Sequence, residues 1–141
     1  MENGKKDGDT SQLKRIRDFT DLETWRLARR LRVESYRVSR GFPRDETFGL
    51  ASQIRRAAVS VTANIAEGFG RYSYQENIQF CRQSRGSVYE LRDHFTTALD
   101  AGYISKGQYS VLDRQAISVI KLINGYIRST RERKDISKER S

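Results

Sequence analysis

The sequence predicts an all-α protein folded as an antiparallel, up-down-up-down four-helix bundle. Four segments place apolar residues at the spacing of an amphipathic helix. Each segment is long enough for a helix of about 30–40 Å at roughly 1.5 Å per residue. The connections between the segments are short, which forces consecutive helices to lie antiparallel. A chain of 141 residues fits one domain of this kind.

The first expected helix covers residues 21–40. Thr20 and Glu23 have the spacing of a capping box, in which a hydroxyl and a carboxylate satisfy free backbone N–H groups. Gly41 and Pro43 follow and end the helix. Its apolar face consists of Trp25, Ala28, Leu31, Ser35 and Val38.

The second expected helix covers residues 45–69 and carries two apolar stripes about a third of a turn apart. Gly68 and Gly70 end it. The main stripe consists of Leu50, Ile54, Ala57, Ala58, Val61 and Ile65. Because a bundle helix needs one apolar stripe, we expect the other to pack against a second subunit of a homo-oligomer. This expected oligomer interface consists of Phe48, Val59, Ala63 and Ala66.

A narrow polar row separates the two stripes of the second helix. We interpret it as a hydrogen-bonded seam that fixes helix register, in preference to a ligand-binding or catalytic row. This polar seam consists of Gln53, Arg56, Ser60, Asn64 and Glu67.

Two further capping boxes start the third and fourth expected helices. The third begins at Ser73, with Glu76 completing the box, and ends before Gly102. The fourth begins at Ser105, with Gln108 completing the box, and ends near residue 131. We therefore expect a disordered polar leader over residues 1–17, a bundle domain over 18–131 and a charged flexible tail over 132–141. The apolar residues are Ile78, Cys81, Val88, Leu91, Phe95 and Leu99 in the third helix, and Leu112, Ala116, Val119, Ile120, Ile123 and Ile127 in the fourth.

The chain is strongly basic, with 27 Lys and Arg residues, 18 Asp and Glu residues, a formal net charge of +9 and a sequence pI near 10.0. Residues 19–131 hold 18 of the basic and 11 of the acidic residues, so the bundle itself carries +7. A folded basic surface attracts polyanions through fixed geometry. The alternative is that the charge serves solubility alone.

Five arginines of the first helix fall within about 100° of arc on its solvent face. Guanidinium groups this close repel one another unless anions neutralise them, as a phosphate backbone does. We therefore predict binding to the backbone of RNA or DNA, without base reading. The competing hypothesis is an oligomeric interaction scaffold or accessory subunit whose basic face meets an acidic protein partner. The expected contacts are Arg26, Arg29, Arg30, Arg37 and Arg40, extended by Arg82 and Arg85 of the third helix.

Catalytic and metal chemistry have little support in the sequence. The chain has one histidine, His94, and one cysteine, Cys81. A di-metal bundle needs Glu-x-x-His on two helices, and a nucleophilic triad needs a paired base. We expect no enzyme activity, no metal, no cofactor, and a core position for Cys81. The uncharged runs are shorter than the roughly 18 residues of a membrane span, and the N-terminus has no apolar signal region, so we expect no membrane partner and a cytoplasmic location.

Several runs of residues resemble a known family, most specifically Asn-Ile-Ala-Glu-Gly-Phe-Gly-Arg over residues 64–71. The other runs are residues 42–43, 46–50, 53–60, 85–87 and 102–103, with Phe19, Leu22, Trp25, Ala28 and Leu31 in the first helix. Over residues 19–128 the chain resembles the four-helix-bundle proteins encoded in intervening sequences of bacterial 23S ribosomal RNA genes.

This resemblance implies a cytoplasmic bundle that assembles as a ring, typically a homopentamer. The biochemical role of the family is not established, and an RNA link is indicated by where its genes lie. The chain is also similar in fold to the accessory variability proteins of diversity-generating retroelements, which are basic pentamers that bind nucleic acid and a reverse transcriptase. The family usually has a proline where this chain has Thr62. Threonine restores a backbone N–H there, so we expect a straighter second helix.

Overall fold

The computed structural model describes residues 16–140, with side chains through residue 138. The described chain consists of four α-helices and two short 3-10 helices, without a strand. This confirms the predicted all-α class with four helices. Residues 1–15 of the expected leader lie outside the described residues. The elements in chain order are η1 (Phe19–Asp21), α2 (Glu23–Ser39), η2 (Arg44–Glu46), α3 (Leu50–Phe69), α4 (Tyr74–Asp100) and α5 (Lys106–Arg140).

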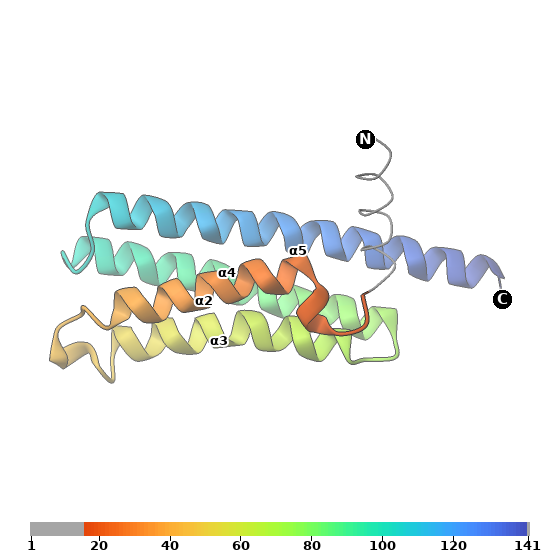
Figure 1. Cartoon of the computed structure of the whole chain (residues 1–141), viewed down its shortest axis with the longest axis horizontal. Helices are drawn as coiled ribbons and strands as arrows, with labels where there is room; N and C mark the ends of the chain where they lie inside the picture. The colour runs from red at the N-terminus through yellow and green to blue at the C-terminus, as the bar shows by residue number, and fades with distance from the viewer. Residues whose placement is uncertain (1–15, 141) are drawn as a thin grey trace, which may run out of the picture.

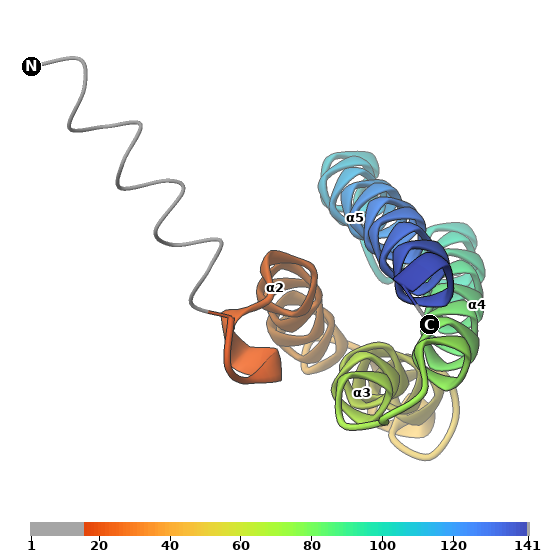
Figure 2. The ribbon, with the colours of Figure 1, turned by 90° about the vertical axis from the view of Figure 1, so that its right-hand side faces the viewer.

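The four α-helices lie lengthwise along one another (Figure 1). In that view the chain runs from right to left along α2 and α4, and from left to right along α3 and α5. Figure 2 looks along the helices and shows them in the order α2, α3, α4, α5 around the molecule. Each helix packs against its neighbour in this order, and α2 also packs against α5, in the smallest of these four pairings. By contrast, α2 and α4 do not pack together.

The core lies between the helices and contains the apolar residues expected there. The main stripe of α3 is buried throughout, from Leu50 to Ile65, and α4 buries Leu91 and Phe95 completely. Burying one large apolar side chain stabilises a fold by about 1.5–3 kcal/mol. On α2, Ala28, Leu31 and Ser35 are buried, whereas Trp25 and Val38 are half-buried at the edge of the core.

Two expected helix starts are confirmed by their caps. The hydroxyl of Ser105 accepts a hydrogen bond from the backbone N–H of Gln108 (3.1 Å), and the Gln108 side chain accepts one from the backbone N–H of Ser105 (2.8 Å). At the start of α4, the hydroxyl of Ser73 accepts a hydrogen bond from the backbone N–H of Glu76 (3.3 Å). Such caps satisfy N–H groups that have no partner within the helix.

The expected start of the first helix was wrong. Thr20 does not cap α2, because it lies within η1 and its hydroxyl donates to the carboxylate of Asp18 (2.9 Å). The capping box is formed instead by Asp18 and Asp21, and α2 begins after the extended residue Leu22. Leu22 is buried, and the chain bends there to place that side chain in the core.

The second helix also starts later than the expected residue 45. Residues 44–46 form the separate 3-10 helix η2, and α3 begins only at Leu50. Between them the backbone of Gly49 adopts φ −105° and ψ −116°, far from helical values, so the two turns cannot join into one helix.

Gly68 does not end α3, contrary to our expectation. It lies within the helix and is buried, one residue before the last helical residue, Phe69. A Cβ at this position would lie 2.8 Å from the side-chain oxygen of Asn77 and 2.9 Å from the Cβ of Phe80 on α4. Gly68 is therefore required for the close approach of α3 and α4. Gly102, by contrast, follows α4 with a φ of +77°, as expected for a glycine at a helix end.

Helix α5 continues to Arg140, which corrects the expectation of a charged tail that begins at residue 132. The physical reason is local, since Glu, Arg and Lys are good helix formers and residues 126–140 contain neither glycine nor proline. The last part of α5 extends past the ends of the other three helices (Figure 1). Within the described residues, none of the helices is both long and apolar enough to cross a membrane.

Candidate nucleic-acid interface

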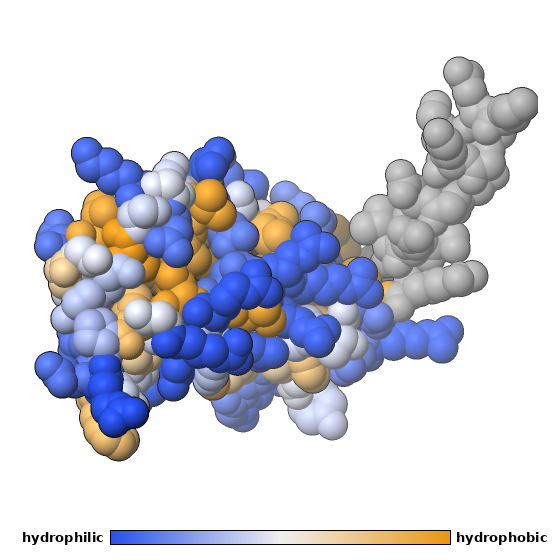
Figure 3. Space-filling model, turned by 60° about the vertical axis from the view of Figure 1, so that its left-hand side comes forward, coloured by the Kyte–Doolittle hydropathy of each residue, from blue (hydrophilic) through white to orange (hydrophobic). Residues whose placement is uncertain are grey.

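The outward face of α2 carries five exposed arginines. Because Ala28, Leu31 and Ser35 turn toward the core, residues about half a turn away point to solvent. Figure 3 shows one side of the molecule, on which hydrophilic side chains cover much of the surface and apolar areas lie between them. We call these five residues the α2 arginine row, and they are Arg26, Arg29, Arg30, Arg37 and Arg40.

Few acidic groups neutralise the α2 arginine row. Arg37 forms an ion pair with Glu34 (2.7 Å), in which its own side chain stays largely exposed. Arg26 donates from Nε to the backbone oxygen of Thr20 (2.9 Å), and the guanidinium of Arg29 lies 5.7 Å from the centre of the Trp25 ring. The row therefore leaves most of its positive charge available to an external anion.

Arg26 also contributes to the electrostatics around η1. The pKa of Asp21 is lowered, first by hydrogen bonds from the backbone N–H groups of Arg17 and Asp18 and then by the nearby charge of Arg26. The carboxylate of Asp21 is thus committed to its own turn, and it does not pair with the arginines farther along α2.

A cleft of about 460 Å³ lies beside the first part of the α2 arginine row. It runs toward α5, which contributes Gln115, and its other walls come from α2. The lining residues are Arg26, Arg29, Arg30, Val33, Glu34 and Gln115. Three guanidinium groups in one cleft can bind the phosphate groups of a nucleic-acid backbone.

The structure does not bring Arg82 and Arg85 together with the α2 arginine row. Both lie on α4, which does not pack against α2. Arg85 is half-buried and donates to the side-chain oxygen of Asn124 on α5 (2.7 Å). Arg82 lines a separate cleft of about 650 Å³ with Arg131 and Lys134 of α5. The seven expected contacts therefore belong to more than one surface.

The expected oligomer interface lies on the outside of this chain. Phe48, just before α3, is 95% exposed, and Val59 is 42% exposed. Ala63 is exposed as well, and Ala66 is half-buried. A phenylalanine that is almost fully exposed is unusual and marks an apolar surface that water covers in the single chain.

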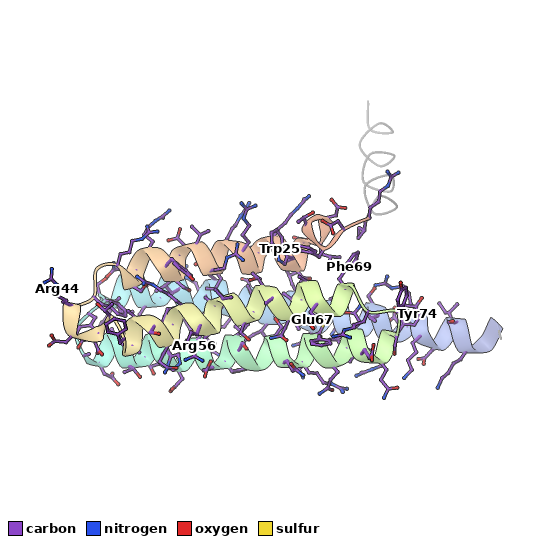
Figure 4. The ribbon with its side chains drawn as sticks, turned by 90° about the horizontal axis from the view of Figure 1, so that it is seen from below. Trp25, Arg44, Arg56, Glu67, Phe69 and Tyr74 are labelled. Atoms are coloured by element: carbon purple, nitrogen blue, oxygen red, sulfur yellow. The ribbon has the colours of Figure 1, made fainter. Side chains whose placement is uncertain are left out.

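Only the middle of the expected polar seam forms a seam. Ser60 shares a hydrogen bond with Ser87 of α4 (2.8 Å), and Asn64 donates to both the backbone and side-chain oxygens of Ser60 (2.8 and 3.0 Å). Gln53, Arg56 and Glu67 are exposed, and Glu67 pairs with Arg71 instead (2.9 Å). Figure 4 labels Arg56 and Glu67 near the two ends of this row on α3.

Sequence reasoning missed two arginines between α2 and α3. Arg32 donates from Nη1 to the hydroxyl of Thr62 (3.0 Å), and Arg55 donates from Nε to the hydroxyl of Ser39 (3.0 Å). Arg55 also lies over the ring of Tyr36, 5.4 Å from its centre. On a helical wheel both arginines fall at the flank of the apolar face, so neither the core pattern nor the solvent face included them.

The remaining reactive side chains serve packing in the core or ion pairing between helices. Cys81 is buried in the core, as expected, and burial raises the pKa of its thiol to about 11, so the thiol is neutral at physiological pH. Arg92 forms an ion pair with Asp113 of α5 (2.8 Å), which raises the pKa of Arg92 and links the two helices. Among the described residues no three His, Cys, Asp or Glu side chains gather as metal ligands.

The fold and the arginine-rich surface define a basic protein of four α-helices. Residues 20–125 match the family model described as 23S rRNA-intervening sequence protein. The match spans most of the chain, so the protein belongs to this family, as the sequence resemblance predicted.

A solved structure supports the same fold. It is the 1.70 Å crystal structure of a protein with unknown function from the S23 ribosomal protein family, from Bacteroides thetaiotaomicron VPI-5482. The TM-score is 0.69 at 19% sequence identity, and the match covers 74% of this chain and 97% of that chain. At this identity the likeness shows the fold alone. No curated protein sequence matches the chain.

Proposed function

We propose that this protein is a non-catalytic, cytoplasmic protein that binds the backbone of RNA or DNA through the α2 arginine row. One observation carries the proposal: five guanidinium groups lie exposed on one helix, and within the part of the chain that the structure describes Arg37 alone of the five forms an ion pair with a carboxylate. Exposed positive charge on a rigid helix favours binding to a regularly spaced polyanion. The family name refers to 23S rRNA intervening sequences, which supports a nucleic acid as the anion.

We further propose that the bundle, with its up-down topology, assembles as a homo-oligomer through Phe48, Val59, Ala63 and Ala66. The exposure of Phe48 and Val59 supports this interface, because both side chains leave apolar area in water in the single chain. The family resemblance favours a ring, typically a pentamer. A ring repeats the α2 arginine row on every subunit and so strengthens polyanion binding through multivalency.

The competing function is an interaction scaffold or accessory subunit with an acidic protein partner. The same arginine row supports it, because guanidinium groups pair equally well with carboxylates. The two functions differ in their response to salt and competitors. Phosphate contacts make log K fall by about 0.9 per contact with log salt on duplex DNA and by about 0.7 on single strands. An acidic protein partner binds with fixed stoichiometry and is not displaced by competitor RNA.

The test is fluorescence-anisotropy titration of labelled structured RNA, duplex DNA and heparin at increasing salt concentrations. We expect a steep salt dependence and tighter binding to one nucleic acid than to heparin. The charge-reversal variant Arg26→Glu, Arg30→Glu, Arg37→Glu should lose binding while light scattering gives an unchanged mass. Retained binding by this variant would reject the α2 arginine row as the site, and equal binding to heparin would favour the acidic protein partner.

A further inference from the structure

Arginines line part of the groove between α2 and α3, over residues 32–40 and 47–60. Two clefts of about 440 and 560 Å³ lie in it, and they adjoin, because Tyr36 and Val59 line both. Phe48 and Val59 of the proposed oligomer interface line these clefts, whereas Ala63 and Ala66 do not, so the groove borders that interface. We call this feature the α2–α3 groove. None of its lining residues is acidic. The arginines that line it are Arg32, Arg37, Arg40, Arg55 and Arg56.

Two of these arginines differ from the exposed α2 arginine row, because Arg32 and Arg55 are half-buried. Each is held by a hydroxyl group, Arg32 by Thr62 and Arg55 by Ser39. A hydroxyl orients a guanidinium but does not neutralise it, and a partly desolvated charge gains from an anion at contact distance. The ion pairs found among the described residues involve other side chains. The groove thus holds two guanidinium groups whose orientation is fixed and which can bind anionic groups.

The two guanidinium groups are spaced for a polymer. Arg32 and the Ser39 that holds Arg55 are seven residues apart on α2, which corresponds to about 10 Å along the helix at roughly 1.5 Å per residue. Arg40, next to Ser39, is exposed at the same end of the groove. A small anion contacts one such group, whereas a chain of phosphates contacts both.

The recessed position of these cations favours a flexible strand. Packed helices lie about 8–10 Å apart, so the groove between them is much narrower than a nucleic-acid duplex. A duplex holds its phosphates on a stiff, convex surface and reaches the outward α2 arginine row more easily than side chains within the groove. A single strand can bend inward, and its unstacked bases can stack on an aromatic ring such as Tyr36, which lines both clefts.

We infer that the α2–α3 groove is a binding site for single-stranded nucleic acid, with Arg32 and Arg55 as phosphate contacts. This inference rests on the proposed function and adds the class of nucleic acid and two residues outside the α2 arginine row. It assigns a different task to the groove than to the outward arginines Arg26, Arg29 and Arg30, while Arg37 and Arg40 belong to the α2 arginine row and also line the groove. The outward row attracts any polyanion, and the groove selects a single strand.

The test compares a labelled 20-nucleotide oligouridine with an RNA duplex that has the same number of phosphates, using the full chain. We expect the single strand to bind about tenfold more tightly. Arg32→Gln, Arg55→Gln should weaken single-strand binding about tenfold or more and leave duplex binding nearly unchanged. Loss of two single-strand phosphate contacts should also reduce the salt slope by about 1.4, at roughly 0.7 per contact.

Two controls accompany this variant. Arg26→Gln, Arg30→Gln on the other side of α2 should weaken single strand and duplex equally, and Arg114→Gln on α5, which lines neither cleft, should change neither. Circular dichroism and light scattering check fold and assembly. If the double groove variant loses its fold, Arg56→Gln replaces it, because Arg56 lines the groove, lies outside the α2 arginine row and is exposed, so its loss leaves no buried group unpaired.

The outcomes separate the two proposals. Equal affinity for single strand and duplex, or equal losses on both in the groove variant, would overturn the groove inference and leave the proposed function standing. No binding to either nucleic acid at low salt would overturn both. Selective loss of single-strand binding in the groove variant supports both.

Discussion

Arg32 on α2 donates a hydrogen bond to the hydroxyl of Thr62, which lies within α3. Thr62 in turn donates to the backbone oxygen of Val59 (3.1 Å), one turn earlier in the same helix. Thr62 therefore supplies both a backbone N–H and a hydroxyl that a proline at this position would lack. Helix α3 runs without interruption from Leu50 to Phe69, as expected for a helix without an internal proline.

The first prediction concerns this contact. Thr62→Val should lower the free energy of unfolding by about 1 kcal/mol, because it leaves the half-buried Arg32 without its hydroxyl partner. Thr62→Pro should cost about 3 kcal/mol or more, because it also removes a helix hydrogen bond. Urea unfolding followed by circular dichroism measures both, and the exposed Thr97→Val should stay within about 0.5 kcal/mol of the wild type. A Thr62→Pro variant as stable as the wild type would contradict this account.

The second prediction compares two helical glycines. Gly68→Ala should lower the free energy of unfolding by about 1–3 kcal/mol, because the added methyl group would overlap with Asn77 and Phe80 of α4. Gly86→Ala is the matched control, because a Cβ there meets nothing within 4 Å. It should stabilise the protein by up to about 1 kcal/mol through helix propensity. Unchanged or increased stability of Gly68→Ala would show that α3 and α4 are not held this closely.

The third prediction tests which hydroxyl groups cap helices. Ser105→Ala should cost about 1 kcal/mol of stability, because the N–H of Gln108 loses its acceptor at the start of α5. Thr20→Ala should cost less than about 0.5 kcal/mol, because it removes the hydrogen bond from the Thr20 hydroxyl to the exposed Asp18 and keeps the backbone oxygen that accepts from Arg26. Thermal unfolding of the two variants gives the comparison. A larger loss for Thr20→Ala would restore Thr20 as the cap of α2.

The fourth prediction is a pH dependence caused by Cys81. Burial raises the pKa of its thiol from 9.0 to about 11, so the folded state holds the thiol proton more tightly than the unfolded state. The resulting stability is fully present below pH 9 and is lost as the pH rises toward 11. The difference in free energy of unfolding between the wild type and Cys81→Ala should therefore change between these pH values, by an amount on the order of 2 kcal/mol. A constant gap across this range would place the thiol in contact with water.

The fifth prediction concerns assembly. Ala63→Glu places a charge in the centre of the proposed oligomer interface, so the mass from light scattering should fall to that of a single chain. Gln83→Glu is the matched control, because it adds the same charge to an exposed position on α4 and should leave the mass unchanged. An unaltered mass for Ala63→Glu would remove this stripe as the contact between subunits.

The fold could be predicted largely from local patterns. The apolar residues of α3, α4 and α5 recur at helical spacing, and the Ser105 cap depends only on residues three positions apart, so both were visible in the sequence. The start of α2 could not be predicted in this way, because the burial of Leu22 outweighs the favourable spacing of Thr20 and Glu23. The role of Gly68 was hidden for a similar reason, since it depends on how closely another helix approaches.

The candidate site was predictable only in part. The α2 arginine row follows from the angular position of residues on one helix, and the structure places all five on one exposed face. Arg32 and Arg55 could not be found in this way, because the hydroxyl groups that hold them lie on the opposite helix of the pair. Arg82 and Arg85 were grouped with the row by charge alone, and the packing order of the helices separates them.

The continuation of α5 beyond the other helices has a consequence for fusion proteins. Residues 131–140 span about 15 Å of the continuous helix α5 at roughly 1.5 Å per residue, and the side chains of Arg131, Lys134 and Asp135 still line a cleft beside the start of α4. A fluorescent domain joined helically at this end would point in a direction set by the helix phase. Adding or removing one residue would rotate it by about 100° around the α5 axis. The number of residues in a helix that continues α5 would therefore set the direction of an attached label relative to the bundle.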